Sequence, residues 1–154
     1  MEVGAGPGAA TEELRRRAAR VTSLEYDHGS AVSLAARKLG NRGAVLQGDA
    51  AALPFPNETF SSAIAVLVLH HMKSRELQDR AFTEIFRVLR PGGIFLALEI
   101  KDGWLQRVGH IRSTFVPLAP ATVPARLETA GFTRITVDFR RGAFRVCAFR
   151  SRVG

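Results

Sequence analysis

The chain has 154 residues, 46% of them hydrophobic, and a formal net charge of +8, a size and composition that suit one domain with a sizeable core over residues 1–154. Its single cysteine, Cys147, excludes an intramolecular disulfide. Because no apolar run is long enough to span a bilayer and no stretch resembles a signal peptide, we expect a cytoplasmic protein without a membrane segment.

The first feature of the chain is a glycine-rich turn, Glu2-Val3-Gly4-Ala5-Gly6-Pro7-Gly8, between a strand end and a helix. Glycine lacks a Cβ, so the turn can adopt positive φ and let a ligand lie against the backbone. Residues 11–20 then favour a helix, with acids early and arginines late. The unpaired N–H groups at the start of a helix suit an anion, so this turn is a candidate ligand site.

Strand-like and helix-like segments then alternate along the chain. In order, their patterns predict a strand over residues 21–24, a helix over 30–39 stopped by Gly40, strands over 44–47 and 63–69, a helix over 75–90, a strand over 94–100 and a helix over 124–130. The continuous apolar run over 63–69 is typical of a parallel strand covered on both faces. This alternation predicts a doubly wound α/β sheet.

The chain closes with two predicted strands, residues 135–140 and 143–150, joined at Arg141-Gly142 as an antiparallel hairpin. The first alternates apolar and polar residues, which indicates a sheet edge, whereas the second is apolar on both faces and should lie inside the sheet. Residues 133–154 also hold six arginines against Asp138, which is +5 of the total charge. Such an end can bind nucleic acid or an anionic substrate. Because no RNA-binding motif or zinc-finger spacing accompanies it, we expect a solvated edge and no nucleic-acid partner.

Two acidic residues follow predicted strand ends, where ligands bind in doubly wound sheets. Glu25, which lies 21 residues after Gly4, could accept hydrogen bonds from both hydroxyls of a ribose. Asp49 could accept a hydrogen bond from the exocyclic amine of an adenine. Each acid alone could equally be a helix N-cap or a turn residue, but together they predict a pocket for an adenosine.

These segments resemble the successive motifs of the UbiE-like group of class I S-adenosylmethionine-dependent methyltransferases. The resemblance rests on the glycine turn, on V-T-S-L-E ending at Glu25, on G-D-A followed by L-P-F-P-N-E-T-F, on V-L-H-H-M, and on L-R-P-G-G at 89–93. It implies a sheet of order 3-2-1-4-5-7-6 with the last strand antiparallel. It also implies S-adenosyl-L-methionine as the cofactor, a small-molecule methyl acceptor and no metal.

The resemblance implies roles for single residues as well. The cofactor would contact the glycine turn with its methionine end, Glu25 with its ribose, and Asp49 and Ala50 with its adenine, and the backbone near Ala65 would lie beside its methionyl group. The full implied set of cofactor-binding residues is Gly4, Ala5, Gly6, Gly8, Glu25, Tyr26, Asp49, Ala50 and Ala65. His70 and His71 are candidates for a catalytic base by their location, if the acceptor must lose a proton. Either histidine could instead pack and cap the strand end. Trp104 and His110 could line the acceptor pocket, or they could simply pack in the fold.

The chain departs from this family at two places. Phe60-Ser61 stands where Phe-Asp is usual, and only three residues precede Gly4, so the first strand and the helix before it are almost absent. We therefore expect a chain truncated at its N-terminus that is weakly stable and binds the cofactor poorly or not at all. Its incomplete sheet could associate with a second copy.

Two other functions fit parts of the sequence. An NAD(P)-dependent Rossmann oxidoreductase shares the spacing Gly4-x-Gly6-x-x-Ala9 with Glu25, but Asp49 and the closing hairpin argue against it. A non-catalytic, truncated methyltransferase-like protein fits the short start and the basic end. No motif of the sequence identifies the methyl acceptor.

Overall fold

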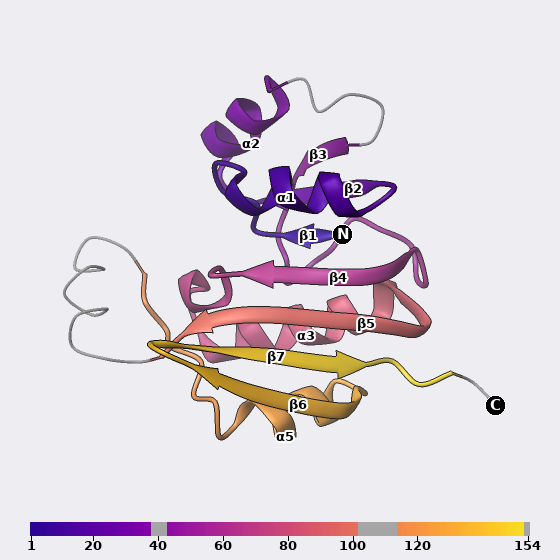
Figure 1. Ribbon diagram of the computed structural model, residues 1–154, viewed down its shortest axis with the longest axis vertical. Coiled ribbons are helices and arrows are strands. Elements are labelled where there is room, and N and C mark those ends of the chain that lie inside the picture. Colours follow the sequence, from indigo (N-terminus) through magenta and orange to yellow (C-terminus); the bar gives the residue numbers. More distant parts are fainter. Residues whose placement is uncertain (38–42, 102–113, 153–154) are drawn as a thin grey trace.

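A computed structural model describes residues 1–37, 43–101 and 114–152, which form a seven-stranded sheet with helices packed against it (Figure 1). The strands are β1 (Glu2–Val3), β2 (Val21–Glu25), β3 (Gly43–Gln47), β4 (Phe60–Val66), β5 (Leu89–Ile100), β6 (Thr133–Arg140) and β7 (Ala143–Phe149). The helices are α1 (Ala9–Arg17), α2 (His28–Ala35), α3 (Arg75–Val88), α5 (Val123–Thr129) and the 3-10 turn η2 (Leu69–His71). No helix in these described ranges is long and apolar enough to cross a membrane.

The order of the strands is β3-β2-β1-β4-β5-β7-β6, as the resemblance implied. The first five strands pair in parallel, whereas β7 pairs antiparallel to both β5 and β6. In Figure 1 the arrows of β1, β4 and β5 accordingly point one way and that of β7 points the other. The predicted doubly wound sheet, the edge position of β6 and the interior position of β7 are confirmed.

The shortest strand, β1, lies inside the sheet, between β2 and β4. Its two residues pair with Ser23 and Leu24 of β2 on one side and with Ile64 and Ala65 of β4 on the other. The two backbone N–H groups that follow, at positions 4 and 5, both donate to the Leu24 carbonyl. The sheet is therefore continuous through β1, and association of two copies through this region stays a prediction.

Several helix and strand ends differ from the sequence prediction. α2 begins two residues early because the Asp27 side chain accepts a hydrogen bond from the Ser30 N–H and caps it. α3 is capped by Ser74 as expected, but it ends at Val88 because Leu89 already pairs with Phe60 of β4. The predicted stop at residue 40 lies outside the described residues.

The end of β4 is a further correction. The strand ends at Val66 and not at residue 69, because Leu67 has a φ of 54° and Leu69–His71 wind into η2. A positive φ takes the backbone out of the extended conformation, so the ladder with β5 cannot continue. The chain therefore turns two or three residues earlier than its apolar pattern suggested.

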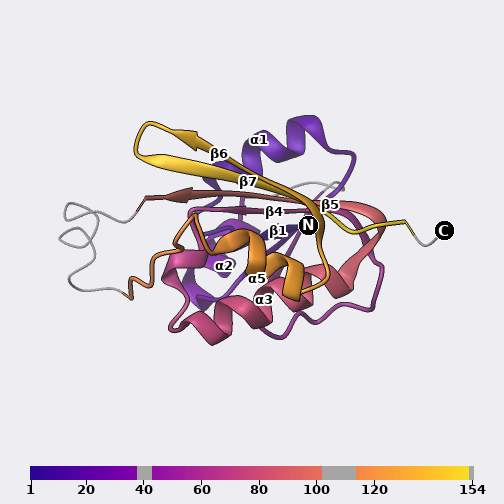
Figure 2. The same ribbon diagram turned by 90° about the horizontal axis from the view of Figure 1, so that it is seen from below.

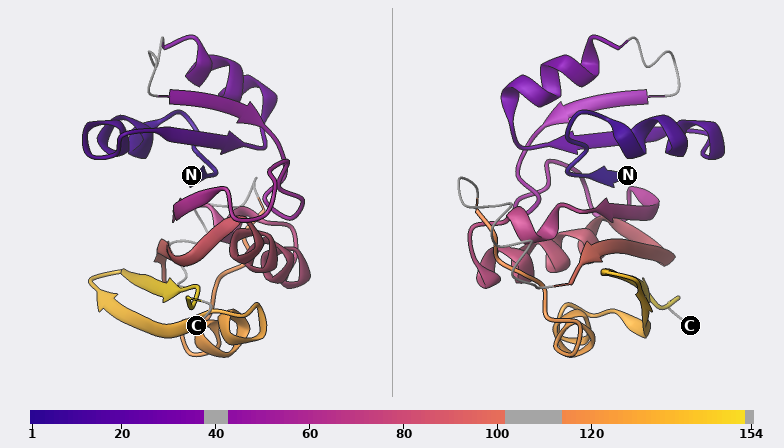
Figure 3. Two further views of the ribbon diagram at one scale, coloured as in Figure 1. Left: turned by 90° about the vertical axis from the view of Figure 1, so that its right-hand side faces the viewer. Right: turned by 60° about the vertical axis from the view of Figure 1, so that its left-hand side comes forward.

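Helices lie on both sides of the sheet (Figures 2 and 3). α3 and α5 pack on one face, where the largest fully buried side chains are Phe82, Phe95, Phe132 and Phe144. α1 lies on the other face, over the part of the sheet near β1 and β2, and α2 adds Leu34 to a small cluster with Ala5 and Val45. This arrangement leaves the carboxyl ends of β1 to β4 together at one edge of the sheet.

Candidate functional site

A cavity of about 690 Å³ lies at this edge, at the carboxyl ends of β1, β2, β3 and β4. Its wall consists of the glycine turn, the residues that follow β2 and β3, and the turn that follows β4. The predicted cofactor residues found in the wall are Gly4, Ala5, Gly6, Glu25, Tyr26, Asp49 and Ala50. The topology thus brings together residues that are spread over almost fifty positions of the sequence.

Two predicted cofactor residues lie behind the wall of the cavity. Gly8 has a φ of 89°, and a Cβ there would lie 2.4 Å from Leu34 Cδ1, so this glycine allows the close packing of α2. Ala65 is fully buried in the core, and the next residue, Val66, lines the cavity instead. Both positions shape the site through packing.

The glycine turn needs its glycines for two different reasons. Gly4 has a φ of 67°, and a Cβ built on it would lie only 1.9 Å from Val68 Cγ2, so no side chain fits there. Gly6 has a φ of 50° but open space around it, so only its backbone conformation favours glycine. That open space belongs to the cavity, where a ligand can approach the backbone.

Glu25 is held in place by the backbone on both sides of it. Its Oε2 accepts from the Gly6 N–H at 2.7 Å, and its Oε1 accepts from the Asp27 N–H at 2.9 Å. Only 9% of the residue is exposed. A carboxylate has about four lone-pair sites, so these two bonds orient it and leave acceptor capacity toward the cavity.

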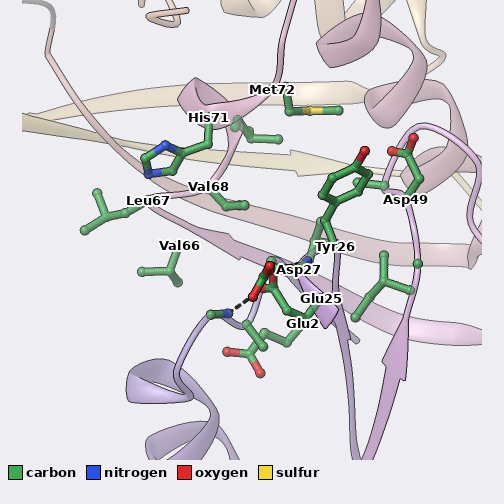
Figure 4. A pocket seen from close by; sticks show the side chains of 18 of the residues that line it. Glu2, Glu25, Tyr26, Asp27, Asp49, Val66, Leu67, Val68, His71 and Met72 are labelled. Atoms are coloured by element: carbon green, nitrogen blue, oxygen red, sulfur yellow. Dashed lines mark hydrogen bonds between the residues drawn. The ribbon is translucent and has the colours of Figure 1, made fainter. Parts of the chain in front are cut away.

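Asp49 forms the far side of the cavity with Tyr26 (Figure 4). Asp49 Oδ1 accepts from the Ala51 N–H at 2.8 Å, a local turn that leaves its other oxygen available. Tyr26 is 64% exposed, and Lys73 Nζ lies 5.9 Å from its ring centroid. An acid and an aromatic face side by side can bind the edge and the face of a flat heterocycle.

The structure separates the two histidines. His70 is buried, 3% exposed, with Nδ1 hydrogen-bonded to Glu99 Oε2, and it does not line the cavity. It therefore occupies the packing and capping position that was the alternative to catalysis. His71 lines the cavity on the side of Leu67 and Val68 (Figure 4). Trp104 and His110 lie outside the described residues.

The two ends of the cavity differ in chemistry. The end near β2 and β3 carries the carboxylates of Glu25 and Asp49, whereas the end near β4 is lined mainly by the apolar side chains of Val66, Leu67 and Met72. No sequence pattern marks these β4-side residues as part of a site, because the left-handed turn at Leu67 that places them is unusual for a leucine. Within the described part of the chain no group of three or more His, Cys, Asp or Glu side chains could hold a metal ion.

Several known proteins are similar in sequence to this chain. A family model described as a methyltransferase domain matches residues 1–97. A probable S-adenosylmethionine-dependent methyltransferase of Mycolicibacterium smegmatis is 31% identical over 140 residues, which are 86% of this chain and 51% of that protein. Demethylmenaquinone methyltransferase of Thermobifida fusca is 30% identical over 71% of this chain and 50% of its own length. The chain thus spans about half the length of these relatives.

Among solved structures, phosphoethanolamine N-methyltransferase 2 of Haemonchus contortus, in complex with S-adenosyl-L-methionine, has the same fold. The TM-score is 0.83 over 98% of this chain and 48% of that one, at 13% sequence identity. A likeness at that identity concerns the fold alone.

Proposed function

The chain belongs to the methyltransferase domain family, in the class I S-adenosylmethionine-dependent group, and we propose that it binds S-adenosyl-L-methionine in the cavity at the carboxyl ends of β1 to β4. We propose further that it transfers the methyl group to a small-molecule acceptor. The observation that carries the proposal is the pair of carboxylates, Glu25 and Asp49, in the wall of one cavity beside a glycine turn.

Each part of the cavity suits one part of the cofactor. Glu25 is oriented by two backbone N–H groups and would accept the ribose hydroxyls. Asp49 would accept from the adenine amine, and Tyr26 and Ala50 would contact the base. The glycine turn, with open space at Gly6, would hold the methionine end.

The bound cofactor supplies an electrophilic methyl group on a sulfonium sulfur, and the contribution of the protein is chiefly to hold the acceptor in line with it. The apolar side chains of Leu67 and Met72 line the cavity on the β4 side and would exclude water there. They favour a small acceptor with apolar surface. His71 would accept a proton if the acceptor carries one on its nucleophilic atom.

One arginine of the basic end, Arg150, has its partners inside the fold. Arg150 donates to the carbonyls of Phe86, Arg87 and Leu89 and pairs with Glu58 at 2.6 Å. Its guanidinium is therefore used inside the fold and is not offered to a partner. The single domain, the cytoplasmic location and the lack of a nucleic-acid partner stay predictions.

Titration calorimetry with S-adenosylhomocysteine and, separately, with NAD tests the cofactor. Glu25→Ala and Asp49→Ala should each weaken binding of S-adenosylhomocysteine by about 1.5–3 kcal/mol, the value of a charge-assisted hydrogen bond, or about tenfold or more. Glu13→Ala, an exposed acid of α1 outside the cavity, is the matched control. If both cavity variants bind like the parent, the assignment is wrong, and tight NAD binding would favour the oxidoreductase.

A further inference from the structure

Glu99, at the end of β5, is a fully buried carboxylate that does not line the cavity. Its Oε1 accepts from two successive backbone N–H groups, those of Val68 at 3.1 Å and Leu69 at 2.8 Å. Its Oε2 is hydrogen-bonded to Nδ1 of His70. A buried carboxylate is tolerated only with such partners, and in the described part of the chain all three belong to the turn after β4.

That turn is held in an unfavourable backbone conformation. Leu67 has a φ of 54°, which costs energy for any residue with a Cβ and persists only where the surroundings impose it. On one side of Leu67 its own N–H donates to the Leu98 carbonyl at 2.8 Å, the last bond between β4 and β5. On the other side the Glu99 carboxylate holds the next two N–H groups, so the turn is fixed from both ends.

Gln78 of α3 fastens the same turn from behind. Its fully buried side chain donates from Nε2 to the carbonyls of Leu69 at 3.1 Å and Val116 at 2.8 Å. The Val116 N–H in turn donates to the His70 carbonyl at 2.8 Å. The turn is therefore a rigid part of the scaffold, and Glu99 is its only charged anchor in the described part of the chain.

The turn forms the wall of the cavity opposite the two acids. Val68 packs against Gly4 so closely that a Cβ on Gly4 would lie 1.9 Å from Val68 Cγ2, and both residues line the cavity. Leu67 lies beside His71 in the wall of the cavity (Figure 4) and is 42% exposed. Asp49 and Leu67 follow β3 and β4, which are three strand spacings apart, about 14 Å. The turn therefore faces the part of a bound cofactor that lies beyond the ribose.

We infer that Glu99 is a positioning residue for the cofactor: through the Val68 and Leu69 N–H groups and His70, it fixes the wall that contacts the methionine end. This inference rests on the proposed function. In this inference His70 serves as the third hydrogen-bond partner of Glu99. The cofactor site then has two ends: Glu25 and Asp49 bind the adenosine, and Glu99 positions the wall at the methionine end.

The test compares two ligands, S-adenosylhomocysteine and adenosine, which share the adenosine end only. Glu99→Leu should weaken S-adenosylhomocysteine binding by about tenfold or more and leave adenosine binding within about twofold of the parent. Glu99→Gln keeps the shape and an oxygen that can accept from both N–H groups, so it should restore most of the affinity. Glu84→Leu is the matched control, because the Glu84 carboxylate also accepts a backbone N–H, that of Leu53, and pairs with Arg87, away from the cavity.

Leu67→Gly provides a second variant that should fold readily, since glycine removes the cost of positive φ. It should leave the melting temperature unchanged or higher and yet lower the affinity for S-adenosylhomocysteine more than that for adenosine. Equal weakening of both ligands, or of neither, in Glu99→Leu and Leu67→Gly would overturn the positioning role. A parent protein that binds neither ligand would instead overturn the proposed function.

Discussion

The two faces of the sheet are built from alternate residues of the same strands, yet they are packed differently. On the face under α3 and α5, the strand residues Ala63, Ala65, Phe95, Ala97, Phe144, Val146 and Ala148 are at most 6% exposed. Their neighbours on the opposite face, Ile64, Val66, Ile94, Leu96, Leu98, Cys147 and Phe149, are all only partly buried. Among the described helices, α1 contacts this second face near β1 and β2, where Thr11 donates to Glu2.

The two faces differ in the kinds of side chain they carry and in whether a helix packs against them. The covered face combines alanines with phenylalanines, so Phe82 and Ile85 of α3 can approach the strands closely. The opposite, half-open face carries branched aliphatic residues on β4 and β5 and Cys147 and Phe149 on β7, with Ile64 opposite Leu96 and Leu96 opposite Cys147. Apolar residues on both faces are typical of parallel strands that are covered twice, but the described helices cover these strands once.

The largest expected effect on stability comes from comparing two neighbours on β5, Phe95 and Leu96, which lie on opposite faces of the sheet. Phe95→Ala should lower the free energy of unfolding by about 3–5 kcal/mol, because it empties a fully buried site between Phe82 and Phe132. Leu96→Ala, on the other face, should cost about 1 kcal/mol, since its side chain is already partly in solvent. Urea unfolding of both variants measures the difference, and equal costs would mean that the second face is covered in solution.

A smaller effect concerns the charged residues of the helices on the two faces. The Arg87 side chain, hydrogen-bonded to Glu84 at 2.7 Å, holds the pKa of that carboxyl below its ordinary 4.5. Because the pKa is lower in the folded state, the stabilisation is present above pH 4.5 and is lost as the pH falls through the folded pKa. Glu84→Gln should therefore cost about 0.5–1 kcal/mol at pH 7 and make stability less dependent on pH below 4.5.

Glu13 lies on α1, the helix on the half-open face, and is the exposed counterpart of Glu84. Its pKa is also lowered, first by its hydrogen bond to Arg17, but both side chains are exposed and solvent screens them. Thermal unfolding from pH 7 to pH 3 should therefore separate Glu84→Gln from the parent and leave Glu13→Gln close to it. A larger change in Glu13→Gln would show that α1 contributes to stability as strongly as α3.

The sequence predicted those features of the fold and the cavity that depend on a local pattern of residues. The alternation of strands and helices predicted the sheet, the two-residue connection predicted the hairpin, and acids at strand ends predicted two residues of the cavity, Glu25 and Asp49. Glu99 was missed because its function depends on N–H groups some thirty residues away, at Val68 and Leu69, and no local pattern encodes such a contact.

The sequence could not decide which of the two adjacent histidines lies in the site, because that also depends on contacts between distant residues. His70 and His71 follow one apolar run, and only the turn at Leu67 decides that the first is buried against Glu99 and the second lines the cavity. Leucine does not favour positive φ, so the residue type gave no sign of this turn. Tertiary contacts with β5 and α3 impose it.

The smallest expected effect is a rate of chemical modification and not a change in stability. Cys147 lies on the half-open face of β7, is partly buried, and pairs in register with Leu96. Burial, and after it the negative charge of Asp138, raise the pKa of its thiol. Since only the thiolate reacts, alkylation at pH 8 should be slower than that of a small free thiol and should speed up as the pH rises toward the raised pKa.

The route of that reaction distinguishes an open face from a covered one. If Cys147 reacts from the native state, its iodoacetamide rate, followed by intact mass, should be independent of urea below the unfolding transition and unchanged in Phe95→Ala. If the face is covered, modification requires unfolding, so the rate should rise with urea and should be much faster in the destabilised Phe95→Ala protein. Cys147→Ala reports background labelling. A partly exposed thiol on an open sheet needs no unfolding to react. An alkylation rate of Cys147 that follows global stability would therefore show that this face is covered, and the proposed difference between the two faces would be wrong.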